Sequence, residues 1–298
     1  MKNAVWIWIV RVISLCVLGP IAGGLMSSLQ GVDGSRFATP MLSNSLMSGL
    51  LVLLGVFFLA MIAGVVASKA VSLREGVLNM GLVLGWGAWG AGQVGEALRA
   101  VPESGSLLKL AFEGALVLIL TLWVLIVLTK ASRKDHPHDE CVQLSPTVIS
   151  TARANIAQSM MLLGIGCAVT MVIVWLQVQT DLSGQAVWGG FIGSALAGVA
   201  GGMVIKNHSI ANERSKEPDL SLIPVMVGVL LGGVLGPLLA MVMPGGGKIL
   251  ESIAAGDMPG YLVMSSLAWA AGALIGTPVG YSWVESSVAR QHSPAQHA

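Results

Sequence analysis

Long apolar stretches separated by short polar segments form the main pattern of this chain. Eight stretches are each about 20 residues long and predominantly apolar, which is the length an α-helix needs to cross a membrane. They are Ala4–Met26, Leu46–Ser68, Val77–Leu98, Leu107–Thr129, Ile156–Val178, Ala186–Ile205, Leu222–Met243 and Tyr261–Trp283. The pattern therefore predicts an all-α integral membrane protein, a bundle of about eight transmembrane helices.

The positions of the basic residues give an independent indication of topology, because cytoplasmic loops carry an excess of lysine and arginine. With eight spans, one side of the membrane holds Lys2, Lys69, Arg74, Lys130, Arg133, Lys134, Arg153, Lys206, Arg214, Lys216 and Arg290. The other side holds only Arg36, Arg99, Lys109 and Lys248. We expect both termini to lie in the cytoplasm, in a plasma membrane of the bacterial inner-membrane type. A secretory signal at the N-terminus is the alternative, and Arg11 within the apolar run argues against it.

Composition narrows the class further. The chain is 54% hydrophobic and only 10% charged, whereas soluble domains carry about 25% charged residues. A net charge of +1 gives no basic field for nucleic acid. Thirty-eight glycines suit close contacts between membrane helices, within the chain or with partner membrane proteins or a second copy. The lipid bilayer is the partner that composition itself implies.

The chain divides into two four-span halves, 1–129 and 156–285, joined by a cytoplasmic loop over 130–155 and followed by a tail over 286–298. AGVVAS at 63–68 and AGVAGG at 197–202 occupy corresponding places in the halves, as a four-plus-four duplication requires. VLGP at 17–20 and 234–237 pairs helices that such a duplication would not relate. The duplication stays open.

The third span carries polar side chains at helical spacing. Trp86, Trp89, Gln93 and Glu96 follow one another by three or four residues, so a continuous helix would place them on one face. That face suits the wall of a cavity or transport path. The alternative is a row of side chains at the membrane interface, where tryptophan is common.

Glu113 is the second acid within a span, about two turns into the fourth stretch. It could pair with Lys109 on its own helix and share a charge cluster with Glu96 and Arg99. The alternative is a carboxylate that senses a proton or cation, since ionisable groups inside membranes are functional candidates. Arg11 lies at the opposite depth, where we expect it to extend toward the headgroups.

Three spans contain proline: Pro20, Pro237 and Pro278 are candidate helix breaks, which in transporters expose backbone groups to substrate. Ordinary kinking and small-residue packing is the other interpretation.

Motifs for catalysis, cofactors and metals are weak. GGGK at 245–248 lacks the pattern of a phosphate loop, and all five histidines lie outside the spans. The stretch HPHDEC at 136–141 holds ligand-type residues in a polar loop. We expect no enzymatic activity, no cofactor and no metal site. The sequence favours a permease or channel for a small solute, with a structural or accessory subunit of a larger membrane complex as the alternative.

Overall fold

The structure is a computed structural model that describes residues 2–36, 38–135, 156–178, 182–212, 222–242, 246–255 and 258–291. Within these ranges six helices are long and apolar enough to cross a membrane. They span Val5–Ser27, Leu46–Ala70, Ser104–Ser132, Ile156–Gln177, Ser183–Asn207 and Ile223–Val242. The described residues are thus helical as predicted, and the six apolar helices support a multi-pass integral membrane protein. The count of eight spans, the duplication and the orientation stay predictions.

The elements follow one another as helices joined mostly by short connections. They are α1 (Lys2–Ile13), the π-helical turn η1 (Ser14–Leu18), α2 (Gly19–Ser27), the 3-10 turn η2 (Pro40–Leu42), α3 (Leu46–Ala70), α4 (Leu73–Gly90), α5 (Val94–Ala100), α6 (Ser104–Asp135), α8 (Ile156–Gln177), α9 (Ser183–Asn212), α10 (Ile223–Val242), α11 (Gly246–Ala255), α12 (Gly260–Val263) and α13 (Ser266–Gln291).

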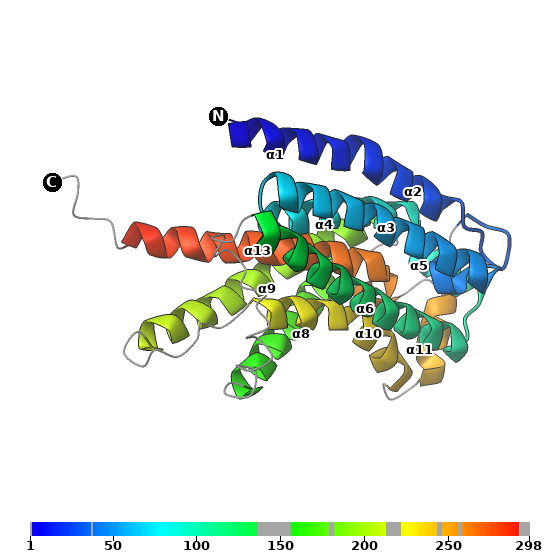
Figure 1. Ribbon diagram of the computed structural model, residues 1–298. Coiled ribbons are helices and arrows are strands. Elements are labelled where there is room, and N and C mark those ends of the chain that lie inside the picture. The colour runs from blue at the N-terminus through cyan, green and yellow to red at the C-terminus, as the bar shows by residue number, and fades with distance from the viewer. Residues whose placement is uncertain are drawn as a thin grey trace.

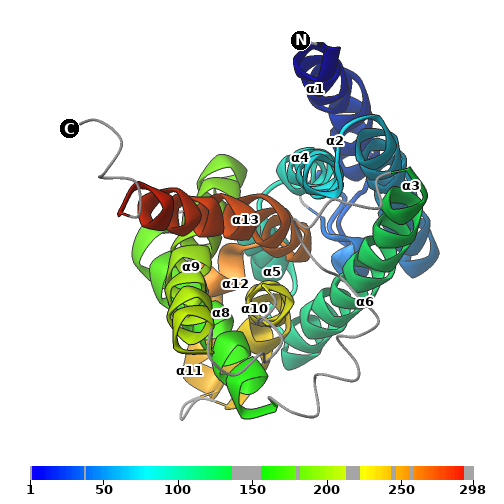
Figure 2. The same cartoon turned by 60° about the vertical axis from the view of Figure 1, so that its left-hand side comes forward.

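Helix α13 lies in the middle of the bundle, against α9, α4, α10 and α6 (Figures 1 and 2). Helices α3 and α6 cover one side, α8 and α9 the other, and α1 with α2 packs at the edge against α4. The start of α1 and the end of α13 lie at one end of the bundle, which we call the α1 end. The short helices α5 and α11 lie at the opposite end, called the α5 end (Figure 1).

Serine side chains define the starts of three helices. The Ser72 hydroxyl accepts a hydrogen bond from the backbone N–H of Glu75, in the Ser-x-x-Glu spacing of a capping box. Ser45 caps α3 through the N–H of Ser48, and Ser265 accepts from the N–H of Ala268 in the first turn of α13. These bonds satisfy backbone donors that a helix leaves unpaired at its N-terminus.

Close backbone contacts hold α13 in place. A Cβ on Gly272, Gly276 or Gly280 would lie 2.6, 2.5 or 1.8 Å from a backbone oxygen of α9, so only glycine permits this approach. One turn before Gly272 on α13, the fully buried Trp269 ring packs against Gly232 and Gly233 of α10. The position of α13 is therefore fixed against two neighbouring helices, α9 and α10.

Two predicted spans differ from the structure. Val77–Leu98 is not one helix, because α4 ends at Gly90 and α5 begins at Val94. Gly92 between them has φ 72°, a left-handed conformation that ends a helix and that glycine adopts without strain. Tyr261–Trp283 is divided at Met264–Ser265, between α12 and α13.

The three prolines were candidate helix breaks, but two of them do not interrupt their helices. Pro237 lies inside α10 and Pro278 inside α13, and both helices continue through them. Pro20 lies in the first turn of α2, directly after η1, where the N–H of Gly19 donates to the Ser14 carbonyl five residues earlier.

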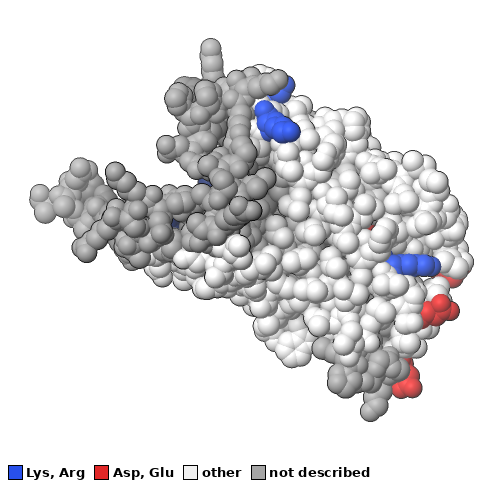
Figure 3. Space-filling view, turned by 60° about the horizontal axis from the view of Figure 1, so that its bottom comes forward, with Lys and Arg blue, Asp and Glu red and all other residues white. Residues whose placement is uncertain are grey.

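Charged side chains lie mostly at the margins of the face drawn in Figure 3, and a broad surface without them lies between. Exposed apolar side chains on the candidate spans include Phe58, Ile119 and Val172, each more than half exposed. Such a surface suits contact with lipid. The loop stretch 136–141 lies outside the described residues.

Candidate functional site

The centre of the site is Glu113, which has no exposed surface. It lies on α6 and accepts hydrogen bonds from two other segments. The Ser266 hydroxyl at the start of α13 donates to Oε1 at 2.5 Å, and the backbone N–H of Met41 in η2 donates to Oε2 at 3.0 Å. One carboxyl group thus joins a long helix, a helix start and a connecting loop.

The loop that reaches Glu113 connects α2 to α3 and is held in place at both ends. Gly31 and Ser43 form an isolated β-bridge, and the N–H of Asn44 donates to the Gln30 carbonyl at 2.8 Å. Between these anchors, the segment 38–43 is buried. The Thr39 hydroxyl in it lies near the Glu113 carboxyl and has no well-formed hydrogen bond. The carboxyl group and this hydroxyl leave unused hydrogen-bonding capacity inside the protein.

The predicted face of the third span is not formed. Trp86 packs on Gly19 and Gly23 of α2, and Trp89 is 59% exposed. Gln93 lies in the break before α5, and Glu96 lies on α5 beyond it. Because the helix ends at Gly90, the spacing that placed these four side chains together does not apply, and they do not line one cavity wall.

The ion pairs differ from the predicted charge cluster of Glu96, Arg99, Lys109 and Glu113. Glu96 binds Arg99 at 2.9 Å, as its spacing suggested. Arg11 binds Glu75 of α4 through two hydrogen bonds of 2.6 and 3.0 Å, rather than extending to the headgroups alone. These are the two ion pairs among the described residues, so Glu113 is not paired with Lys109 there.

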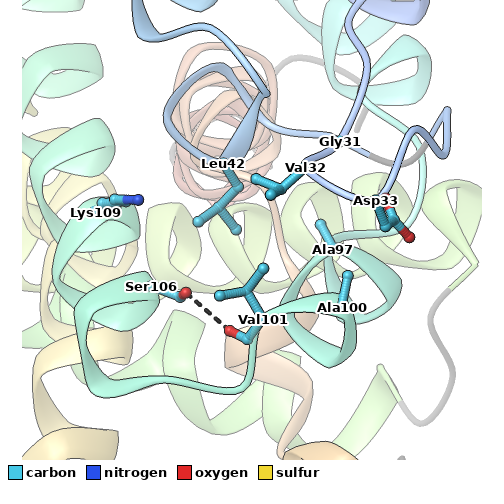
Figure 4. Close-up of a pocket in the computed structure, with 9 residues that line it drawn as sticks. All are labelled: Gly31, Val32, Asp33, Leu42, Ala97, Ala100, Val101, Ser106 and Lys109. Atoms are coloured by element: carbon cyan, nitrogen blue, oxygen red, sulfur yellow. Dashed lines mark hydrogen bonds between the residues drawn. The ribbon is translucent and has the colours of Figure 1, made fainter.

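Lys109 instead lines a depression at the α5 end, shown in Figure 4 and called the Lys109 pocket. Its volume is about 140 Å³, and it is formed by the loop after α2, by α5 and by the start of α6. Lining residues are Gly31, Val32, Asp33, Leu42, Ala97, Ala100, Val101, Ser106 and Lys109. Leu42, one of the lining residues, directly follows Met41 in the chain, so the η2 turn contacts both the pocket and Glu113.

A second, smaller depression of about 20 Å³ lies farther along the same helices and is called the Pro278 pocket. It is lined by Arg74, Val77, Leu125, Leu222, Ile223, Met226 and Pro278, from α4, α6, α10 and α13. Leu125 follows Glu113 by 12 residues, and Pro278 follows Ser266 by the same number. Helices α6 and α13 therefore run side by side in the same direction, and the pocket lies about 18 Å beyond the Glu113–Ser266 contact.

Two buried threonines lie between the Glu113–Ser266 contact and the Pro278 pocket. Thr121 is on α6 and Thr277 on α13; each is 0% exposed, and neither hydroxyl has a hydrogen-bond partner. On α13, Thr277 follows Ser266 by 11 residues, close to three full turns, so the two lie on the same side of that helix. On α6, Thr121 follows Glu113 by eight residues, a spacing that also falls on one side of a helix. Threonine in a helix usually bonds the carbonyl four residues earlier, as Thr129 does with Leu125. We call the line of Glu113, Ser266, Thr121 and Thr277 the α6–α13 seam.

Sequence reasoning singled out Glu113 and missed its partners. Ser266 was available as a polar residue in the last apolar stretch, and Thr121 and Thr277 were equally visible. Thr39 and Met41 had no signal, because only tertiary structure brings the loop after α2 to α6. No cluster of three histidine, cysteine, aspartate or glutamate side chains that could hold a metal occurs among the described residues.

No protein-family model matches this chain, and no curated protein or solved structure matches it either.

Proposed function

We propose that the protein is a permease for a small solute, with a path along the α6–α13 seam. The observation that supports this most is the row of buried polar side chains between two depressions, the Lys109 pocket and the Pro278 pocket. Buried polar groups inside an apolar bundle are costly, so their occurrence in one line favours a role in passage of a polar species.

The arrangement resembles the general design of transporters in one physical respect. Helix α12 ends at Val263 and α13 starts at Ser266, so the last predicted span is discontinuous beside Glu113. Discontinuous helices supply backbone groups for solutes within membranes. The seam itself is closed at the η2 turn, where Thr39 and Leu42 are buried, as expected for one state of an alternating-access cycle.

The size of the Lys109 pocket limits the solute. Drug-sized ligands occupy pockets of about 300–1,000 Å³, and this one is about 140 Å³. Its lining combines one acid, Asp33, one base, Lys109, one hydroxyl residue, Ser106, and otherwise glycine and apolar residues. A small polar solute of low net charge fits that lining. The distribution of lysine and arginine in the sequence supports an orientation with the Lys109 pocket outside the cell and both termini in the cytoplasm.

Purification in a gentle detergent followed by reconstitution tests this function against the alternative of an accessory subunit. A permease should purify alone or as a homo-oligomer, and vesicles containing it should admit at least one of a panel of small polyols, amides and amino acids faster than protein-free vesicles. Recovery only in a stoichiometric complex with other membrane proteins, with no gain in permeability, would refute the permease and support the subunit.

A further inference from the structure

Glu113 is a buried acid, and within the part of the chain that the structure describes it has no basic partner. On α6 itself Lys109 lies one turn away, is exposed and lines the Lys109 pocket, and it forms no ion pair with Glu113 among the described residues. In the loop after α2, Asp33 and Arg36 are both exposed. Helix α3 carries only Lys69, at its far end, and α10 carries no titratable side chain. On α5, Glu96 is paired with Arg99.

The other helices that pack beside Glu113 bring no base to it among the described residues. Helix α4 carries Arg74 and Glu75 in its first turn, but Glu75 is paired with Arg11 and Arg74 lines the distant Pro278 pocket. Helix α12 contributes Tyr261 as its titratable side chain, and the described part of α13 has none before Tyr281. A carboxyl group in such a place is stabilised in only two ways: by hydrogen bonds to its ionised form, or by uptake of a proton or another cation.

The contacts of Glu113 are suited to both protonation states. An ionised carboxylate accepts hydrogen bonds from the Met41 N–H and the Ser266 hydroxyl, and the 2.5 Å distance to Ser266 Oγ is in the range of an O–H···O⁻ bond. When a proton binds, the carboxylic O–H can donate to Ser266 Oγ, because a hydroxyl both donates and accepts. Oε2 can still accept from Met41.

We propose that Glu113 is the proton-binding site of the protein, and that its proton is the ion coupled to solute movement. This inference rests on the permease proposed above. The reaction is simple: the carboxylate takes one proton from the aqueous phase and its charge changes from −1 to 0. The hydrogen bond from Met41 then goes to a neutral oxygen and loses about half of its strength.

The expected consequence is movement of η2. In the ionised state the Met41 bond holds the buried segment 38–42 against α6, and Leu42 in this segment lines the Lys109 pocket. Protonation weakens the bond, so the segment separates from α6 more readily and opens the route from the pocket to the seam. Solute and proton would then use the same opening.

Infrared spectroscopy of the reconstituted protein tests proton binding directly. A protonated carboxyl group gives a C=O stretching band separate from that of carboxylates, and the band moves in heavy water. We expect a pH-dependent band of this kind that disappears in Glu113→Gln and stays in Glu103→Gln, whose carboxyl is exposed just before α6. Ser266→Ala should shift the band, because the group loses a hydrogen-bond partner.

If Glu113→Gln does not fold, the band shift in Ser266→Ala still tests whether the band belongs to Glu113. A band that is absent at every pH tested, or one that Ser266→Ala leaves unmoved, would overturn the proposal. Spectral changes that follow sodium or potassium concentration instead of pH would overturn it too, because the site would then bind a metal cation.

Movement of η2 is measured separately, through the reaction of Leu42→Cys with a hydrophilic thiol reagent in a background whose three native cysteines are replaced. The reaction rate, corrected for the pH dependence of the free thiol, should rise as pH falls, and Glu113→Gln should remove the dependence. A rate equally pH-dependent in both would refute the link. A permeable protein whose Glu113 does not titrate would refute proton coupling alone, whereas a titrating Glu113 in a protein without permeability would refute the permease.

Discussion

The contact between α9 and α13 should not tolerate even one added methyl group at Gly280. An alanine Cβ there would lie 1.8 Å from the backbone oxygen of Ala195, and ordinary contact begins at 3.4 Å. The helices would have to separate by about 1.6 Å, because neither side is a flexible side chain that can rotate away. Such overpacking costs up to about 3 kcal/mol, and the better helix propensity of alanine offsets about 1 kcal/mol of it. We expect Gly280→Ala to lower the free energy of unfolding by about 2 kcal/mol.

Gly164 provides a matched control within the same bundle. It lies inside α8, and an added Cβ there would meet nothing within 4 Å. Gly164→Ala should therefore leave stability unchanged or raise it by up to about 1 kcal/mol. The assay is equilibrium unfolding in mixed micelles of mild detergent and sodium dodecyl sulfate, followed by circular dichroism. Equal stability of the two variants would refute the close α9–α13 contact and the fixed position of α13.

Two further predictions concern charged groups outside the seam. In a double-mutant cycle, Arg11→Met and Glu75→Gln should show a coupling energy of about 1 kcal/mol, since the pair joins α1 to α4 and is only partly exposed. Additive effects of the two substitutions in the same unfolding assay would contradict the ion pair. The hydrogen bonds from Ser35, first from its side chain and then from its backbone N–H, lower the pKa of Asp33 in the Lys109 pocket. Ser35→Ala should raise that pKa toward its ordinary value, as measured by carboxyl-carbon NMR. In the native protein the hydrogen bonds from Ser35 to Asp33 stabilise the loop above the ordinary pKa, and this stabilisation is lost as pH falls through the lowered pKa. An unchanged titration in Ser35→Ala would show that the side chain of Ser35 does not act on Asp33.

The helical class of the protein followed from the sequence because six of the eight long apolar runs correspond to helices long and apolar enough to cross a membrane. The predicted start of the second span, Leu46, is the start of α3, where Ser45 caps the first turn. The third span was predicted from Val77, but α4 begins at Leu73 after the Ser72 cap. The break after α4 was harder to predict. Gly92 adopts a positive φ there, yet the chain has many other glycines that lie inside helices without breaking them.

The site could be predicted only in its central residue. Glu113 stood out because an acid in an apolar stretch is rare, but its partners come from a loop 72 positions away and a helix start 153 positions away. Such long-range contacts leave no periodic signal in one sequence. The polar face predicted for the third span is absent because the helix ends at Gly90. Residues three or four positions apart share a face only as long as the helix continues through them.

The most direct test of a solute path along the α6–α13 seam is the water accessibility of Thr277. In membranes, with the native cysteines replaced, Thr277→Cys is treated from either side with a small hydrophilic thiol reagent, which reacts only with a thiol that water can reach and ionise. Ile119→Cys, on the 62% exposed, apolar side of α6, is the control. The seam predicts that Thr277→Cys is modified and Ile119→Cys is not. Protection of Thr277→Cys from both sides, at every pH at which the reagent works, would contradict a path through this protein.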